Sequence, residues 1–293
     1  MGVISRFAPS PTGRLHLGHA YSAVRAHDLA RRAGGAFLLR IEDIDGTRSR
    51  DDYVTAIAED LRWLGLSWDG PVVRQSERMP LYATALERLK RMEMIYPCFC
   101  TRAEIAASAS APHGAEGPIY PGTCRSLSET ERATRMHEPH CWRLDMAKAV
   151  EVAAADPAGK PGGTLIWYDA CAGRIEADPL AAGDVVLARK ETPTSYHLAV
   201  TVDDAAQGVT DVVRGVDLFE ATHIHRLLQA LLGLPTPHYH HHPLLIGPDG
   251  KRLAKREGAQ PLAELRAAGA DPAALLASLR TDQLPIGVLS ADA

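Results

Sequence analysis

The segment from residue 3 to residue 19 constrains the fold more than any other part of the chain. Its first residues, VISRFA (3–8), form an apolar run that predicts a short strand, which Pro9 and Pro11 end. Apolar residues at helical spacing then run from Leu17 to about Arg32, and the glycines at 34 and 35 predict the helix end. A strand, a short loop and a helix in this order predict the start of an α/β fold.

The alternation of strands and helices continues downstream. The run AFLLRIEDID (36–45) begins as a buried type of strand and ends in carboxylates, and helices are expected over about 51–64, 80–94 and 222–233. For SYHLAVTVDDAAQGVTDVVRG (195–215) we expect a strand, a short acidic turn and a second apolar run. This pattern predicts a doubly wound parallel sheet, whose ligands bind outside the carboxyl ends of the strands.

A change of composition divides the chain. Residues 98–190 are richer in Ala, Gly, Pro and Cys, with weak periodicity and short strand-like runs at 141–146 and 164–169. We interpret this range as an insertion between two halves of a Rossmann-like catalytic domain, 1–97 and 191–243. Residues 244–293 are expected to form a glycine-bearing loop and a short helical C-terminal segment.

Composition limits the partners and the compartment. The net charge is −4, so nucleic acid would have to bind local patches, such as the one formed by Lys251, Arg252, Lys255 and Arg256. No apolar run approaches the ~18 residues of a membrane span, and the N-terminus lacks the apolar core of a signal peptide. We therefore expect a soluble cytoplasmic protein, by default a monomer.

Two histidines lie at the predicted start of the first helix. His16 and His19 flank Gly18, which lets a ligand approach the backbone closely. A helix N-terminus favours anions, and imidazoles there can donate hydrogen bonds to phosphate oxygens. Taken alone, the quartet is equally well explained as a helix-start turn.

A second cationic element follows more than two hundred residues later. The loop GPDGKRLAKREG (247–258) contains four cations and is flanked by glycines, which suits a triphosphate leaving group. A solvated basic turn is the alternative for the loop taken by itself.

In combination, these motifs resemble those of the class I aminoacyl-tRNA synthetases, in particular the catalytic core of the glutamyl-tRNA synthetases. His16-Leu-Gly-His19 matches the HIGH signature of that class. The run from Arg252 to Arg256 matches the KMSKS signature, with Arg252 at the first Lys, Ala254 at the Ser and Lys255 retained. The resemblance covers nearly the whole chain. It implies ATP binding by His16, Gly18, His19, Arg252 and Lys255, with His16, His19 and Lys255 catalytic.

A glutamate site is expected on physical grounds as well. Glutamate has two carboxylates and an ammonium, and guanidinium groups bind carboxylates in a bidentate manner. The resemblance implies that glutamate is bound by Arg6, Phe7, Ala8, Pro9, Ser10, Glu42, Tyr196 and Arg214. Surface ion pairing of the two arginines and core packing of Tyr196 are the alternatives. Asp43 and Asp45 are weaker candidates, which could cap a loop or pair with Arg40 or Arg48.

The cysteines indicate a metal site. Cys98, Cys100 and Cys124 could close around a tetrahedral zinc ion, and spacing alone leaves the fourth ligand open among Tyr120, His113, Cys141 and water. Short paralogues of the glutamyl-tRNA synthetases carry a Cys-x-Cys…Tyr-x3-Cys zinc site, so the resemblance implies Cys98, Cys100, Tyr120 and Cys124. Buried unliganded thiols are the alternative. Cys141 and Cys171 are expected in the core, and His238 and His240–His242 at a strand edge beside the nucleotide pocket.

The length of the chain indicates which group of glutamyl-tRNA synthetase relatives it resembles most. Only 37 residues follow Arg256, too few for the helical anticodon-binding domain of a full glutamyl-tRNA synthetase, so none is expected. The chain is thus similar to the glutamyl-Q tRNA(Asp) synthetases. This implies that L-glutamate is activated with ATP and Mg²⁺ and transferred to queuosine in tRNA(Asp). A truncated synthetase for tRNA(Glu), an adenylate-forming ligase with a small acceptor, and a non-catalytic tRNA-binding paralogue stay open.

Overall fold

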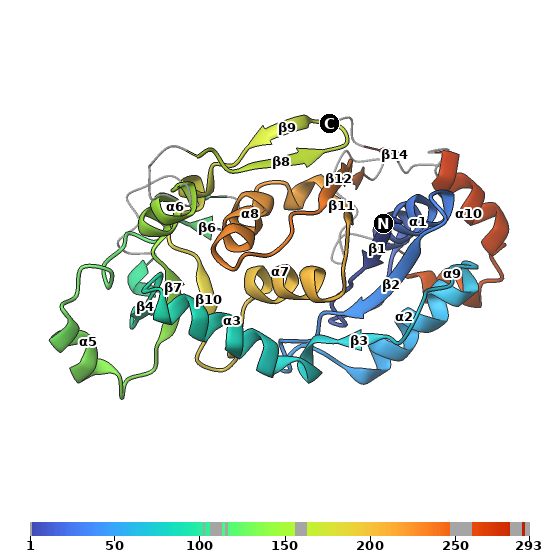
Figure 1. The fold of residues 1–293 in the computed structure, drawn as a ribbon. Helices are drawn as coiled ribbons and strands as arrows, with labels where there is room; N and C mark the ends of the chain where they lie inside the picture. The colour runs from blue at the N-terminus through green and yellow to red at the C-terminus, as the bar shows by residue number, and fades with distance from the viewer. Residues whose placement is uncertain are drawn as a thin grey trace.

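A parallel sheet forms the N-terminal part of the protein. The computed structural model describes residues 2–101, 103–105, 113–114, 117–155, 163–246, 260–281 and 289–290. Strands β1 (Ile4–Phe7), β2 (Ala36–Ile41) and β3 (Val73–Arg74) pair in that order, all parallel. Helix α1 (Leu17–Arg32) connects β1 to β2, and α2 (Asp51–Trp63) connects β2 to β3 (Figure 1).

A second group of strands continues the sheet on the other side of β1. Strands β11 (Asp211–Gly215), β12 (His238–His242) and β8 (Ile166–Asp169) are parallel, and β9 (Gly173–Glu176) pairs antiparallel with β8. Strand β11 lies beside β1, where the Thr210 amide donates to Ile4 O over 2.9 Å. The chain order therefore reverses between β1 and β11, which is the switch point where doubly wound sheets bind ligands.

Helices cover both faces of this sheet. In β1, the Ser5 hydroxyl donates to Ala26 O of α1, whereas Arg6 pairs with Asp204 of α7 (Tyr196–Ala206). Successive side chains of a strand point to opposite faces, so α1 and α7 lie on opposite sides. Helix α8 (Ala221–Leu231) packs against α7, α10 (Pro272–Thr281) against α1, and α9 (Leu262–Ala267) against α2.

A small antiparallel sheet lies at the far end of the molecule from α1 (Figure 1). Its strands are β4 (Ile95–Cys98), β7 (Cys141–Leu144) and β10 (Val186–Ala188), in the order β10-β7-β4. The remaining elements are α3 (Met79–Arg91), α5 (Glu129–Arg135), α6 (Met146–Ala154), the 3-10 turns η1 (Gln75–Glu77), η2 (Pro179–Ala182) and η3 (Val216–Leu218), and the two-residue strands β5 (His113–Gly114), β6 (Gly117–Pro118), β13 (Leu245–Ile246) and β14 (Leu289–Ser290).

Most predicted elements are confirmed. Strand β1, strand β2 and helices α1, α2, α3 and α8 all lie where the sequence indicates. The α/β class with a parallel sheet is confirmed as well. No helix within the described ranges is both long enough and apolar enough to cross a bilayer.

The prediction of a strand and an acidic turn at the start of 195–215 is wrong, because residues 196–206 form helix α7. The Ser195 side chain caps this helix by accepting a hydrogen bond from the Leu198 amide over 3.4 Å. The helix is buried on most of its circumference and is rich in β-branched residues, so it lacks the polar face that reveals an amphipathic helix.

The range 98–190 contains strands of two different sheets. Strand β7 belongs to the antiparallel sheet, whereas β8 pairs with β12 of the main sheet. The residue ranges of the domains and of the insertion stay a prediction.

Gly35 provides a test of the packing between β1 and β2. A Cβ atom on Gly35 would lie 1.9 Å from Val3 O, so we expect Gly35→Ala to lower the free energy of unfolding by at least about 2 kcal/mol. The neighbouring Gly34 has φ +62° and open space around it, so Gly34→Ala is expected to cost only about 1 kcal/mol. Urea denaturation measures both, and equal effects would contradict the steric explanation.

Candidate functional site

The two signature histidines cap helix α1. His16 is the N-cap residue, and its Nδ1 accepts a hydrogen bond from the Gly18 amide over 3.1 Å. His19 Nδ1 accepts from the His16 amide over 3.2 Å, and the two ring centroids lie 3.8 Å apart. Since each Nδ1 accepts, each neutral ring carries its proton on Nε2. Both imidazoles are therefore N–H donors at the positive end of a helix.

The chain on either side of the cationic loop packs against the same region. Leu245 belongs to the core around α1, and beyond the loop the Leu262 amide donates to Leu15 O over 2.8 Å. Pro261 also forms a β-bridge with His16. Arg252 and Lys255 themselves lie outside the described residues.

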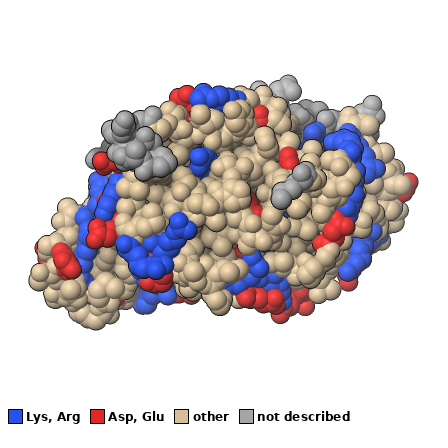
Figure 2. Space-filling model, viewed as in Figure 1, with Lys and Arg blue, Asp and Glu red and all other residues tan. Residues whose placement is uncertain are grey.

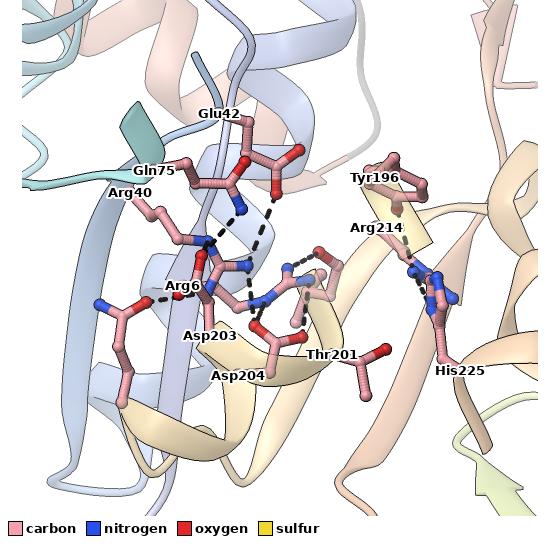
Figure 3. Close-up of polar contacts among 12 residues, drawn as sticks. Arg6, Arg40, Glu42, Gln75, Tyr196, Thr201, Asp203, Asp204, Arg214 and His225 are labelled. Carbon is pink, nitrogen blue, oxygen red and sulfur yellow. Dashed lines mark hydrogen bonds and ion pairs between the residues drawn. The ribbon is translucent and has the colours of Figure 1, made fainter. Parts of the chain in front are cut away.

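A buried ion network joins β1 and β2 to α7 (Figure 3). Arg6 Nε and Arg40 Nη2 lie 3.0 Å and 2.8 Å from the same oxygen, Asp204 Oδ1. The Arg6 and Arg40 side chains are 5% and 0% exposed. Burial raises the pKa of Asp204, but the charges of the two arginines outweigh it and lower the pKa below its ordinary value. Arg6 is thus a buried, paired cation and not a surface one.

Glu42 lies at the edge of this network. Its carboxylate is 3.5 Å from Arg40 Nη2, and its backbone amide donates to Pro9 O over 3.1 Å, which joins the end of β2 to the first loop. Burial raises the pKa of Glu42, and the charges of Arg40 and Arg6 offset this only in part. A cationic group beside Glu42 would therefore stabilise its ionised form.

Asp203 forms the other half of the network. Its carboxylate accepts hydrogen bonds from Gln75 Nε2 at 2.8 Å, Arg78 Nε at 2.7 Å and Tyr82 Oη at 2.7 Å. The Asp203 side chain is 0% exposed, so this carboxylate is held entirely by protein donors. Its role is to fix α7 against η1 and α3.

Arg214 lies across the site from this network, and its guanidinium contacts neutral acceptors (Figure 3). Nε lies 3.1 Å from His241 Nε2, Nη1 lies 3.3 Å from Tyr196 Oη and 3.4 Å from His225 Nδ1, and Nη2 lies 2.5 Å from Thr222 Oγ1. Arg214 is 5% exposed, and within the described ranges no carboxylate lies at salt-bridge distance from it. A buried cation in this setting favours an anionic ligand.

The groups around Arg214 are neutral mainly because they are buried, and the charge of Arg214 adds to this effect for the two imidazoles. Burial and the charge of Arg214 lower the pKa of His241 to about 4 and that of His225 well below its ordinary value. Burial raises the pKa of Tyr196 to about 12, although Arg214 acts in the opposite direction. At neutral pH, both imidazoles are therefore acceptors for the guanidinium.

A cavity of about 210 Å³ opens beside these residues. Three of the predicted glutamate-binding residues line it, namely Ser10, Glu42 and Tyr196. Its remaining lining residues are Thr12, Ile44, Asp45, Arg48, Gln75, Arg189, Thr192, Thr194 and Ser195. Tyr196 lines the cavity and accepts a hydrogen bond from Arg214, so it links the buried guanidinium to the cavity wall.

The other residues predicted for the glutamate site are buried or half-buried, and the weaker candidates Asp43 and Asp45 form ion pairs within the protein. Phe7 is 6% exposed and belongs to the main core, and Pro9 is buried, whereas Ala8 is half-buried. Asp43 accepts from Arg74 and Ser76, while Asp45 pairs with Arg48 over 2.6 Å. A hydrogen bond from Thr47 and the contact with Arg48 lower the pKa of Asp45 to about 2.

Three cysteines form a group that could hold a metal ion, with Cys98 at the end of β4, Cys100 just after it and Cys124 in the turn that precedes α5. The sulfurs of Cys98, Cys100 and Cys124 all lie within 4.8 Å of one another. Tyr120 Oη lies 3.6 Å from Cys100 Sγ and accepts from the Cys124 amide over 2.8 Å. A hydrogen bond with Cys141 lowers the pKa of Cys98 to about 4 despite burial. Three thiols and a phenol fit a thiophilic divalent ion.

Two expectations about neighbouring residues need correction. Cys171 is exposed and not in the core, because it follows β8 in a surface turn. The histidines of β12 do not lie on an edge strand, because β12 is flanked by β11 and β8. His240 pairs with Asp211 over 2.8 Å, and His241 with Asp169 over 2.8 Å.

The surface charge is dispersed on the face shown in Figure 2. Lys and Arg side chains form separate patches there, several of them beside Asp or Glu, with wide uncharged areas between them. The patch expected from Lys251 to Arg256 lies outside the described residues. The described part of this face therefore shows no single continuous basic surface.

The fold and the site together define a class I tRNA synthetase catalytic domain. The family model for class I tRNA synthetases (E and Q), catalytic domain, matches residues 2–285. The chain belongs to the glutamyl-Q tRNA(Asp) synthetase family and is a ligase. It is 52% identical to the glutamyl-Q tRNA(Asp) synthetase of Rhodobacter capsulatus, across 92% of this chain and 97% of that protein. It is 48% identical to that of Symbiobacterium thermophilum, across 94% of this chain and 84% of that protein.

Two solved structures of glutamate-tRNA ligases have the same fold as this chain. A glutamate tRNA ligase from Elizabethkingia meningosepticum, in complex with its amino acid, matches with a TM-score of 0.72 and 30% identity. The match covers 88% of this chain but 53% of that protein, and a glutamate-tRNA synthetase from Elizabethkingia anophelis matches equally well. This chain thus spans about half the length of these synthetases.

Sequence reasoning missed several residues of the site. The sequence places Asp203 and Asp204 in a turn, so it does not predict the pairing of Asp204 with Arg6 and Arg40 or that of Asp203 with Arg78. Had α7 been identified, two adjacent acids within an apolar helix would have indicated buried ion pairs. Arg189 and Thr194 line the cavity from an irregular segment that carries no periodic signal.

The neutral state of His241 has a measurable consequence for stability. Its pKa is about 4 when folded, against an ordinary value of 6.5, so the unfolded chain binds more protons between these values. Stability therefore decreases as pH falls through this window, by about 2 kcal/mol between about pH 7 and about pH 5 for this one group.

Urea denaturation at both pH values tests this expectation. The His241→Gln variant should lose about 2 kcal/mol less than the parent chain on acidification, since it lacks the titrating group. The same pH dependence in both proteins would contradict a neutral buried His241.

Proposed function

We propose that this protein activates L-glutamate with ATP and Mg²⁺ and transfers it to queuosine at the wobble position of tRNA(Asp). The observation that carries the proposal is Arg214, a buried guanidinium without a carboxylate partner in the described structure, beside a cavity lined by Glu42 and Tyr196. Relatives at 48–52% identity that are named glutamyl-Q tRNA(Asp) synthetase support the same assignment.

The chemistry of the site favours glutamate over a neutral amino acid. Arg214 would bind one carboxylate of the substrate, and Glu42 would bind its ammonium group, with Tyr196 and Ser10 as neutral hydrogen-bonding partners. Arg6 would act mainly through its charge, since its Nε and Nη2 contact Asp204 and its Nη1 contacts Val213 O. A substrate amide in place of the carboxylate would leave the Arg214 charge unpaired, and burial makes this costly.

The first chemical step needs stabilisation of charge and no side-chain nucleophile. An oxygen of the glutamate α-carboxylate bonds to the α-phosphorus of ATP, and the bond to the pyrophosphate leaving group breaks. His16 and His19 would donate Nε2–H to phosphate oxygens at the α1 N-terminus, and Lys255 and Arg252 would hold the leaving group. Bound Mg²⁺ would neutralise phosphate charge.

The second step transfers the glutamyl group. A hydroxyl oxygen of the queuosine cyclopentene diol bonds to the carbonyl carbon of the adenylate, AMP leaves, and the hydroxyl proton is released. The cavity opens beside the end of β2 and the first loop, so an acceptor that enters there would meet the activated carbonyl. Positioning supplies the catalysis in this step as well.

The cysteine group would hold one structural zinc ion through Cys98, Cys100, Cys124 and Tyr120. The thiol of Cys98 is readily ionised, as a zinc ligand must be, and all four donor groups come from one compact region. The ion would tie the end of β4 to the turn that precedes α5.

Glutamate-dependent exchange of pyrophosphate into ATP tests the first step. We expect exchange by the chain alone, and a loss of at least about 100-fold in His19→Ala and Lys255→Ala. The matched controls are His238→Ala, on the exposed start of β12, and Lys148→Ala, whose amine pairs with Glu93. Unchanged exchange in both site variants would contradict the assignment of the site.

Radiolabelled glutamate tests the second step with three acceptors. We expect label on tRNA(Asp) that carries queuosine and none on tRNA(Asp) without it or on tRNA(Glu). Label on tRNA(Glu) alone would indicate a minimal glutamyl-tRNA synthetase. Exchange without label on any of the three tRNAs would indicate a small-molecule acceptor.

Metal analysis of purified protein tests the zinc site. We expect one equivalent of zinc in the parent chain and in Cys171→Ser, and loss of the metal in Cys100→Ser and Cys124→Ser. Tyr120→Phe should release zinc to a chelator faster than the parent chain, whereas Cys141→Ser should not. Faster release of zinc from Cys141→Ser than from Tyr120→Phe would indicate that Cys141 is the fourth ligand.

A further inference from the structure

Three adjacent strands of the main sheet each contribute one polar residue to a continuous row. Asp169 ends β8, His241 lies in β12, and Arg214 lies in β11 directly opposite His241. The Asp169 and His241 side chains are 1% and 2% exposed. Since all three strands are parallel, the row lies at their shared carboxyl ends, where the cavity also lies.

The hydrogen bonds of the row have one consistent direction. Asp169 Oδ2 lies 2.8 Å from His241 Nδ1, and His241 Nε2 lies 3.1 Å from Arg214 Nε. An ionised carboxylate can only accept, so the neutral imidazole carries its proton on Nδ1. Its Nε2 is then an acceptor, as the N–H of Arg214 requires.

Asp169 is itself fixed by the backbone. Its Oδ1 accepts from the amides of Cys171 at 2.8 Å and Ala172 at 3.0 Å, and its Oδ2 also accepts from the His241 amide at 3.1 Å. Burial raises the pKa of Asp169, but these amide donors outweigh it and lower the pKa. The carboxylate is therefore ionised and fixed in orientation.

We propose that Asp169 and His241 are positioning residues that set the plane of the Arg214 guanidinium for the substrate carboxylate. Nε, Nη1 and Nη2 of Arg214 already contact His241, Tyr196, His225 and Thr222, which leaves one N–H on Nη2 in the described structure. A substrate carboxylate would accept from this N–H, or replace Tyr196 at Nη1, and a rotation of the guanidinium plane would turn these donors away from it. The inference rests on the proposed function, in which Arg214 binds glutamate.

A neighbouring pair of the same chemistry is a matched control. His240 Nε2 lies 2.8 Å from Asp211 Oδ1, as close as the Asp169–His241 contact. Residues 240 and 241 point to opposite faces of β12, and His240 does not contact Arg214 in the described structure. The His240 and Asp211 side chains are 27% and 13% exposed, against 2% and 1% for His241 and Asp169. This pair therefore controls for the loss of a His–Asp contact from the sheet but not for the difference in burial.

The first experiment compares Asp169→Asn with Asp211→Asn by glutamate-dependent pyrophosphate exchange. In Asp169→Asn the amide oxygen stays with the amides of Cys171 and Ala172. The amide nitrogen then faces His241 Nδ1 and also the His241 backbone N–H, whose hydrogen bond to Oδ2 is lost. The imidazole must become an acceptor there, which moves its proton to Nε2 and opposes the Arg214 donor.

We expect the KM for glutamate in Asp169→Asn to increase by about 10- to 100-fold, the factor that a hydrogen bond to a charged group contributes. The KM for ATP should change by less than about 2-fold, since the α1 histidines are untouched. Asp211→Asn should keep both values. An equal increase of both KM values in Asp169→Asn, or an increase in Asp211→Asn alone, would overturn the proposal.

A double-variant cycle separates positioning from a structural effect. In His241→Gln the side-chain oxygen can accept from Arg214 Nε without Asp169, so adding Asp169→Asn to this variant should raise the KM for glutamate no further. An undiminished effect of Asp169→Asn in that background would mean that Asp169 acts by another route.

The tautomer of His241 in the parent protein gives a result that needs no variant. Nitrogen-15 NMR of labelled histidine should find the His241 proton on Nδ1, and a proton on Nε2 would overturn the proposal even if Asp169→Asn did not fold. Absence of glutamate-dependent exchange in the parent protein would refute the proposed function instead. Exchange by the parent with an unchanged glutamate KM in Asp169→Asn would refute the positioning role alone.

Discussion

The shared carboxylate of Asp204 is the interaction on which the arrangement of the site depends. It accepts from Arg6 of β1 and Arg40 of β2, so it joins α7 to two adjacent strands, one of which, β1, borders the point where the chain order reverses. Removing this carboxylate would leave two buried cations uncompensated, which is among the most destabilising changes a protein interior can undergo. Ion pairing thus fixes the position of Tyr196 relative to Glu42.

The site combines parts that the sheet brings together from distant segments. The first loop supplies Ser10, the residue after β2 is Glu42, α7 supplies Tyr196 and β11 supplies Arg214. Every one of these segments ends or begins at the carboxyl edge of the parallel strands. Anionic substrate groups would meet two distinct cationic regions, the α1 N-terminus and Arg214, each built from rigid elements.

The sequence predicts the features that short local patterns encode, and it does not predict those that depend on burial or on contacts between distant segments. Strand β1, helix α1 and the histidine pair follow from local periodicity and from proline and glycine signals, so they were predicted closely. Burial on most sides of α7 hides its helical period, so the sequence predicts a strand there and does not reveal Asp203 and Asp204 as buried ion-pair partners. The row that contains Asp169, His241 and Arg214 depends on contacts between distant segments, since Asp169 and His241 are 72 residues apart, and no local pattern encodes this.

The capping role of the histidines changes what their presence means in related chains. His16 and His19 satisfy backbone amides at the start of α1, so they stabilise the fold whether or not any nucleotide binds. A relative that had lost its enzymatic activity would still have a reason to retain both. Arg214 is different, because a buried cation without a carboxylate contact lowers the stability of the fold. In an inactive protein, no bound substrate would offset this cost. In a search for pseudoenzymes within this family, loss of the arginine would be more informative than loss of the signature motif.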